Sequence, residues 1–591
     1  MSNLDHLQSI RHTLVHLLAA SVIELYPGAQ NAIGPAIEDG FYQDFYIPVA
    51  ISDKDLEAIE KKMRGKLKVW QKLKTSEMKT VTVEQARKEF SWNQYKSELI
   101  NDFSKESKEI TFSLTGDFLD LCKGGHAQDL SEIKLDAFKL DRVAGAYWKG
   151  DEHNIMLTRI YGLAFFTKEE LKAFLARREE AKKRDHRKIA HEQDLLIFSD
   201  LVGSGMPLYT PRGNVIRNAI IGYSRELNAR LGFGEVHTPN INKAELFKIS
   251  GHYDLYKADM LSVKSQYVSD EMFLKPMNCP QHTQIYASRP RSYRDLPIRF
   301  ADFANLYRDE QPGQLSGLTR LRSFAQDDGH IFCRQDQIEE EISNILSAIQ
   351  EALSTYKIGY RMRFSLRDPD NSAKYLGSDD VWEHSQDIMR KLLQSKGVDF
   401  WQAEGEAAFY GPKIDIMAVD ALQRQWQIST IQLDFNMPSR FRLTYTASDG
   451  TEQTPVMIHR ALIGSPDRFL GVLIEHYAGA FPVWMAPVQV AVIPVGEDFI
   501  QASQTLAKEF AGARIRCEVR DENESVGYKI RTTAKEKIPY VIVIGEREAP
   551  KVGTWKKSST LSVRVRGKEE LLSISLGDFL KHIQQEIQER K

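Results

Sequence analysis

The chain has 591 residues, of which 42% are hydrophobic and 27% charged, and its formal net charge is −2. This length exceeds what a single hydrophobic core supports, so we expect three or four domains. No apolar run reaches the roughly 18 residues that a membrane-spanning helix needs, and four cysteines are too few for a disulfide framework, which together favour a cytoplasmic protein with no membrane partner.

The N-terminal 166 residues are predicted to form an α+β domain. Apolar spacing predicts a helix over 11–26 that ends at Pro27, and turn residues predict a hairpin around Asp39 and Gly40. A charged helix follows over 53–72. Residues 167–193 read as one long charged helix without an apolar face large enough for a core, so we expect a helical linker there.

Two further domains are predicted beyond the linker. From 194 to 485, strand-like runs such as "RLRSFAQDDGHIF" (320–332) follow one another with few helices between them, which favours an antiparallel α+β sheet. From 486 to 591, apolar strands alternate with helical stretches at 498–511 and 525–537, which is typical of a small α/β domain. The expected fold class is therefore a multidomain α+β and α/β protein.

One cysteine stands out by its surroundings. Cys279 lies in "KPMNCPQHTQIY" (275–286), among turn and polar residues rather than in an apolar run. With His330 and His459 it could supply the soft sulfur and nitrogen ligands that zinc prefers, from three distant segments. Cys333 is a weaker candidate, since three residues after His330 on a strand it points to the opposite face. From the residues alone, a packing role for Cys279 stays open.

The chain resembles the bacterial-type threonyl-tRNA synthetases, a class II family, from about residue 5 to about residue 585. The resemblance includes the class II motifs: a helix and strand that end at Pro239, the loop around Arg308 and Glu310, and the "SPDRFLG" helix. It is carried by the stretches "FANLYRDEQPGQLSGLTRLRSFAQDDGHIFC", "GEAAFYGPKIDI", "TIQLDFNMPSRF" and "PVMIHRALIGSPDRFLGVLIEHYAG". A small β-rich domain that many relatives carry in front is expected to be absent.

This resemblance implies an ATP-dependent ligase that makes threonyl-adenylate and then threonyl-tRNA, with Mg²⁺ accompanying ATP. It implies one zinc ion per subunit, held by Cys279, His330 and His459, whose remaining positions take the amino and hydroxyl groups of threonine. The implied catalytic residues are Arg308, Lys413 and Arg468. The implied ATP-binding residues are Arg308, Glu310, Arg320, Gln427, Ser465 and Arg468, and the implied amino-acid-binding residues are Gln326, Asp328, Tyr410 and Gln432.

A second site is expected in the N-terminal domain. Serine lacks only one methyl group of threonine, a difference worth about 10- to 200-fold in a pocket, so hydrolytic editing of seryl-tRNA is needed. The residues that match the family's editing domain are His12, His16, Lys96, Asp120, Cys122 and His126. Two alternatives stay open, since the histidines could be core residues and a His₃Cys set could hold a second zinc. Gly125 replaces the family's usual proline before His126.

The C-terminal domain resembles the family's anticodon-binding domain, which implies tRNA(Thr) as a partner. The matching positions are Asn523, Lys529, Glu548 and Arg564, although a solvated charged surface also explains each one. The class II resemblance implies a homodimer through the helix and strand before Pro239. The rivals are a non-enzymatic paralogue that kept the fold and a class II ligase for another amino acid.

Overall fold

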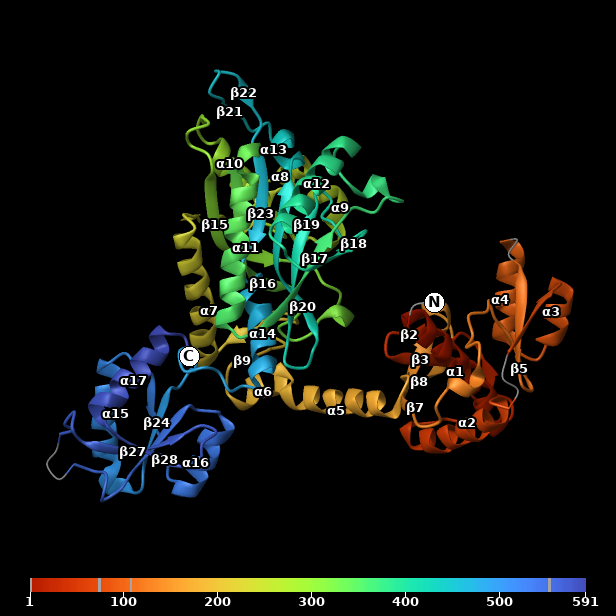
Figure 1. Cartoon of the computed structure of the whole chain (residues 1–591), viewed down its shortest axis with the longest axis horizontal. Helices are drawn as coiled ribbons and strands as arrows, with labels where there is room; N and C mark the ends of the chain where they lie inside the picture. Colours follow the sequence, from red (N-terminus) through yellow and green to blue (C-terminus); the bar gives the residue numbers. More distant parts are fainter. Residues whose placement is uncertain (1–2, 73–75, 107–108, 551–553) are drawn as a thin grey trace. The chain divides into compact units, whose positions relative to one another are not determined.

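The computed structural model describes residues 3–72, 76–106, 109–550 and 554–591 of the chain (Figure 1). The chain divides into two compact units, Met1–Glu179 and Glu180–Lys591. The boundary between them falls inside the predicted linker. Among the described helices, none combines the length and the apolar composition that crossing a bilayer requires.

The prediction of a single helix over 167–193 is wrong. Two helices occupy this stretch, α5 (Lys168–Arg184) and α6 (His186–Glu192). Between them Asp185 leaves the helical region, with φ −49° and ψ 117°, and its side chain accepts the backbone N–H of Arg187. Because that bond satisfies a free N–H at the start of α6, Asp185 ends one helix and begins the next.

The N-terminal unit is built around α1 (Asn3–Leu25) and α2 (Leu56–Trp70), which pack on a sheet in the order β1-β3-β8-β7. The buried side chains of α2 recur at helical spacing, from Leu56 through Ile59 and Met63. The predicted hairpin is confirmed, since β2 pairs with β3 and sets Ile37 opposite Gly40. The bounds are β1 (Gln30–Asn31), β2 (Ala36–Ile37), β3 (Gly40–Tyr46), β7 (Phe138–Tyr147) and β8 (Met156–Ala164).

A smaller sheet in the same unit has the strand order β4-β5-β6, and its last strand carries Asp120. It is accompanied by α3 (Val83–Glu89) and α4 (Gln94–Lys105). Its strands are β4 (Glu77–Val81), β5 (Ile110–Thr115) and β6 (Phe118–Leu121).

The second unit contains the predicted antiparallel sheet. Over the described residues eight strands pair in the order β11-β15-β16-β23-β20-β19-β17-β18, antiparallel except for the outermost pair at each edge. In sheet order the strands are β11 (Gly234–Glu235), β15 (Ile298–Tyr307), β16 (Ser323–Cys333), β23 (Val456–Ala461), β20 (Gln425–Asp434), β19 (Lys413–Val419), β17 (Gly359–Ser365) and β18 (Phe400–Ala403).

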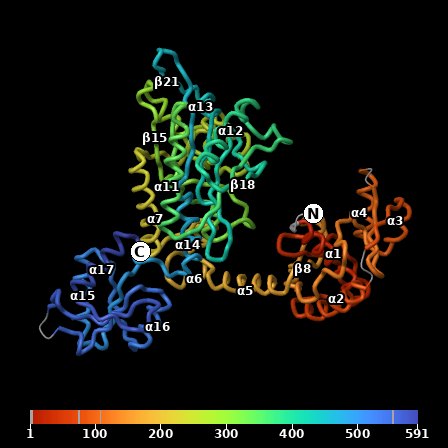
Figure 2. Tube along the Cα trace, in the orientation of Figure 1, coloured from red at the N-terminus to blue at the C-terminus, as the bar shows by residue number. Residues whose placement is uncertain are grey.

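Helices cover this sheet and bury one large apolar core. Among them α7 (Pro211–Arg230) and α11 (Ile338–Thr355) run side by side (Figure 2). Tyr223 Oη on α7 lies 2.9 Å from Thr355 Oγ1 on α11. The other helices are α8 (Ala244–Ser250), α9 (His252–Tyr256), α10 (Cys279–Ala287), α12 (Asp379–Ser395), α13 (Asn436–Arg440) and α14 (Pro466–Tyr477). The short strands are β9 (Leu196–Ile197), β10 (Leu208–Tyr209), β12 (Ile241–Lys243), β13 (Ser262–Val263), β14 (Met272–Leu274), β21 (Tyr445–Thr446) and β22 (Glu452–Gln453).

The C-terminal part has the predicted parallel strands and helices. Here β24 (Val490–Pro494) pairs in parallel with β25 (Cys517–Val519) and β26 (Tyr540–Ile544), and α15 (Ile500–Gly512) and α16 (Val526–Lys535) connect them. The described residues also contain elements that the sequence pattern did not predict, and these make the sheet mixed. They are β27 (Thr560–Val565), β28 (Leu571–Ser575) and α17 (Leu576–Gln588).

Candidate active site and metal centre

Cys279, His330 and His459 come together in the second unit. One donor atom of each lies within 4.8 Å of the others, and all three residues are buried. Cys279 is the first residue of α10, whereas His330 on β16 lies directly opposite His459 on β23. The sheet register therefore joins two histidines that are 129 positions apart in the sequence numbering, and the helix adds the sulfur.

The chemistry of these donors fits zinc. Burial raises the pKa of the Cys279 thiol well above its usual range and lowers the pKa of His330 well below its usual range. Two imidazoles and a thiol that needs a cation to ionise are a typical ligand set for zinc, with a fourth position left open.

A second layer of hydrogen bonds orients both imidazoles. His459 Nε2 lies 3.0 Å from Asp434 Oδ2, and the other Asp434 oxygen accepts the backbone N–H of Asn436 at 2.7 Å. His330 Nδ1 lies 2.8 Å from Nδ1 of His282. These contacts leave His459 Nδ1 and His330 Nε2 available for a metal ion.

Sequence reasoning missed both Asp434 and His282. For His282 a signal existed, since it follows Cys279 by three residues and so lies on the same helix face. Cys333 behaves as expected, because it packs with Ile331 in the apolar core on the other face of β16.

A cavity of about 140 Å³ adjoins the three ligands. Its wall contains all four predicted amino-acid-binding residues, namely Gln326, Asp328, Tyr410 and Gln432. Burial raises the pKa of Asp328 to about 7. The Tyr410 ring stacks on His459 with ring centres 4.6 Å apart, and its hydroxyl donates to Gln432. Polar groups thus surround the space beside the metal ligands.

A larger cavity, of about 480 Å³, shares part of its wall with the first. Arg308, Gln326 and Gln432 line both cavities. The predicted ATP-binding residues all line the larger cavity: Arg308, Glu310, Arg320, Gln427, Ser465 and Arg468.

Two arginines in the larger cavity differ from Arg320 in their ion pairing. Within the described part of the chain, no carboxylate forms an ion pair with Arg308 or Arg468, and Arg468 Nε is buried without a hydrogen bond. Burial lowers the pKa of both guanidinium groups. A partly buried cation that no described carboxylate neutralises gains most from an anionic ligand, so this cavity suits a phosphate group. Arg320 instead pairs with Glu310 at 2.7 Å.

Lys413 is placed differently from the other predicted catalytic residues. Its Nζ lies 2.9 Å from Asp415 Oδ2, and Lys413 is not among the described residues that line either cavity. Asp415 also accepts a hydrogen bond from Gln427 at 2.7 Å. Lys413 therefore reaches the larger cavity through neighbours: its strand partner Gln432, which lines that cavity, and Asp415, a fully buried carboxylate that the sequence did not reveal.

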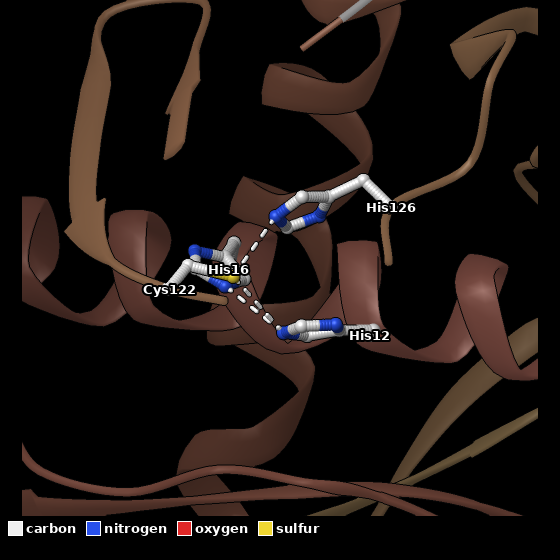
Figure 3. Close-up of side chains that lie close together, drawn as sticks. All are labelled: His12, His16, Cys122 and His126. Atoms are coloured by element: carbon white, nitrogen blue, oxygen red, sulfur yellow. Dashed lines mark hydrogen bonds between the residues drawn. The ribbon is translucent and has the colours of Figure 1, made fainter. Parts of the chain in front are cut away.

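The N-terminal unit contains the second predicted cluster (Figure 3). His12 and His16 lie on one face of α1, with their Nε2 atoms 3.3 Å apart. The Cys122 sulfur lies 3.5 Å from His12 Nε2 and 3.3 Å from His126 Nε2. These four side chains form a compact group whose donor atoms lie within 4.8 Å of one another.

A buried ion pair completes this second cluster. Lys96 Nζ lies 2.8 Å from Asp120 Oδ1, and Asn31, which the sequence did not reveal, donates to Asp120 Oδ2 at 3.0 Å. Burial lowers the pKa of His126 to about 4 and raises that of Cys122 to about 11. A cavity of about 320 Å³ opens beside the cluster.

The turn before His126 rests on two glycines. Gly124 and Gly125 have φ +94° and +85°, values that a proline, held near −65°, cannot adopt. A proline at position 125 would therefore not fit this backbone. His126 nevertheless reaches Cys122.

The four predicted anticodon positions do not form one cluster. Asn523 follows β25 and Glu548 follows β26, both at the carboxyl edge of the parallel strands. Arg564 on β27 lies opposite Val541, near the start of β26 and therefore at the other end of that strand. Lys529 is buried in α16, with 7% of its surface exposed.

Two domain families and many curated relatives match this chain. Residues 257–477 match the tRNA synthetase class II core domain (G, H, P, S and T), and residues 489–586 match an anticodon binding domain. A threonine–tRNA ligase of Rubrobacter xylanophilus is 43% identical, in an alignment that covers 99% of this chain and 90% of the relative. A threonine–tRNA ligase of Gloeobacter violaceus is 42% identical, in an alignment that covers 100% of this chain and 94% of the relative.

A solved structure of a threonyl-tRNA synthetase domain is also similar to this chain. The RNA binding domain of threonyl-tRNA synthetase from Cryptosporidium parvum is 34% identical and superposes with a TM-score of 0.63, over 68% of this chain and 98% of that one. The chain belongs to the threonine–tRNA ligase family.

Proposed function

We propose that this protein activates threonine with ATP and transfers it to tRNA(Thr). The observation that carries the proposal is the junction of the two cavities. A sulfur and two imidazoles line one cavity, and the other is lined by two arginines that pair with no carboxylate among the described residues. An amino acid and a nucleotide bound there would meet at Arg308, which lies in both walls. The names of the relatives agree with this reading.

In the first step, a carboxylate oxygen of threonine attacks the α-phosphorus of ATP. The new C(O)–O–P bond forms as the bond to the β-phosphate oxygen breaks, and pyrophosphate leaves. The protein then has little covalent work to do, and its contribution is positioning and charge neutralisation. Arg308 and Arg468 supply the positive charge, and ATP enters with Mg²⁺.

Selection against valine is the expected purpose of the metal centre. Valine has the shape of threonine without the hydroxyl, so an apolar pocket rejects it weakly. Cys279, His330 and His459 would hold the zinc ion, which would supply a Lewis acid for the amino and hydroxyl groups of threonine. By analogy with sites that hydrogen-bond a substrate hydroxyl, such a site discriminates by about 10⁴–10⁵.

The N-terminal cluster is proposed to hydrolyse seryl-tRNA(Thr). Its support is the convergence of all six predicted residues from α1, α4, β6 and the turn after β6. Burial lowers the pKa of His12 and His126 below the usual range, so both imidazoles are neutral near pH 7 and can accept a hydrogen bond from a water molecule.

The C-terminal domain is proposed to bind the anticodon of the tRNA, as its match to an anticodon binding domain supports. The homodimer and the cytoplasmic location stay predictions of the sequence.

Threonine-dependent exchange of pyrophosphate into ATP tests the ligase proposal. We expect exchange with threonine, weak exchange with serine and none above background with valine. A chain that exchanges with another amino acid instead, or with none, contradicts the proposal. Zinc analysis of the same preparation shows whether the ligand set is occupied.

A further inference from the structure

A third group of possible metal ligands lies outside both sites, at the start of α6. Donor atoms of Asp185, His186 and Glu475 lie within 4.8 Å of one another. The ring of His186, however, uses both nitrogens: Nδ1 donates to Glu475 Oε1 at 2.6 Å, and Nε2 accepts the backbone N–H of Leu318 at 2.9 Å. The imidazole is thus a bridge between two parts of the protein rather than a free ligand.

One end of this bridge is anchored firmly. The backbone N–H of His186 also donates to Glu475 Oε1, at 3.1 Å. The other Glu475 oxygen accepts from Arg424, which is itself paired with the buried Asp420. Because Glu475 lies on α14, these bonds fix the position of the imidazole relative to the main body of the sheet domain.

The other end reaches the loop between β15 and β16. Residues 316–320 form a tight turn, with Ser316 bridged to Arg320, and Leu318 lies at its tip. Leu318 is buried with 1% of its surface exposed, and its N–H donates to the imidazole. The contact is close, because a Cβ added to Gly317 would lie 2.1 Å from His186 Nε2.

This turn forms part of the larger cavity. Leu318, Thr319 and Arg320 all line it, beside Arg468. We propose that His186 is a positioning residue for ATP binding. Its imidazole holds the 316–320 turn so that Arg320 faces the nucleotide. The proposal rests on the function proposed above. Without the imidazole, the buried N–H of Leu318 loses its acceptor, and the turn must move to satisfy it.

The test compares His186→Ala with His191→Ala. His191 is on the same helix but is exposed, so it is a matched control. In pyrophosphate exchange, we expect His186→Ala to raise KM for ATP about fivefold, the factor for one lost hydrogen bond. KM for threonine is expected to stay at the wild-type value, and His191→Ala to behave as wild type. His186→Gln, which can still accept the N–H, should recover part of the loss.

Hydrogen exchange gives a second readout that does not depend on activity. Amides of the 316–320 turn should exchange faster in His186→Ala than in the wild type, with no change in the zinc-site strands. A wild-type KM for ATP in His186→Ala overturns the proposal, as does an equal rise of KM for threonine or the same effect in His191→Ala. If His186→Ala does not fold, His186→Gln decides by the same criteria.

The failure of this proposal is separable from that of the ligase function. A wild-type protein without threonine-dependent exchange refutes the ligase function. In that case hydrogen exchange of the 316–320 turn can still be measured in His186→Ala. Exchange as slow as in the wild type refutes the proposal that His186 holds the turn.

Discussion

Replacing Asp434 by Asn tests the metal centre without touching a ligand. Asp434 is fully buried, and its Oδ2 accepts the N–H of His459 at 3.0 Å. Its other oxygen is held by the backbone N–H groups of Asn436 and Met437, at 2.7 and 2.9 Å. The amide of Asp434→Asn must keep its oxygen on those two donors. Its NH₂ group then faces the N–H of His459, so an attraction becomes a donor–donor repulsion.

The size of the effect follows from this contact. A hydrogen bond to a charged group contributes about 1.5–3 kcal/mol. Loss of an outer-shell partner usually weakens metal binding by about 10- to 100-fold. The two ranges agree, since tenfold corresponds to about 1.4 kcal/mol. We therefore expect Asp434→Asn to bind zinc about 10- to 100-fold more weakly than the wild type.

Competition with a chromophoric chelator measures this affinity. Threonine-dependent exchange should fall in parallel at low zinc and recover when zinc is added. Asp44→Asn is the control, because Asp44 is also buried and paired, with Arg159 at 2.6 Å, but lies in the N-terminal unit. Wild-type zinc affinity in Asp434→Asn, or an equal loss in Asp44→Asn, would refute the reasoning.

Three further results are expected. Cys279→Ala should lose both zinc and threonine activation, and its metal content should fall from one ion per chain to none. A second ion in the wild type would show that the N-terminal cluster binds metal. Arg468→Gln should lower the rate of pyrophosphate exchange about 10²- to 10³-fold while zinc content stays constant. The reason is that the lost cation faces phosphate and has no acidic partner in the described structure. Unchanged exchange would contradict the role of Arg468. His12→Ala should let seryl-tRNA accumulate with unchanged threonine activation, measured by deacylation of seryl-tRNA; normal deacylation would place editing elsewhere.

Local patterns predicted much of the architecture. The antiparallel central sheet and the three parallel C-terminal strands appear where apolar runs and turn residues indicated them. The linker shows the limit of such patterns. Charge and length suggested one helix, but a single capping aspartate, Asp185, divides it.

The amino-acid sequence by itself determined the chemical identity of the site: a cysteine among turn residues, two histidines on strands, and arginines in motifs that resemble one enzyme family. Tertiary structure alone decided what supports these groups. Asp434 behind His459, His282 behind His330 and His186 under the 316–320 turn are set by strand register and helix packing, which join residues far apart in the chain. Local periodicity reports which face a side chain occupies but not which distant side chain it meets, because that depends on how whole elements pack.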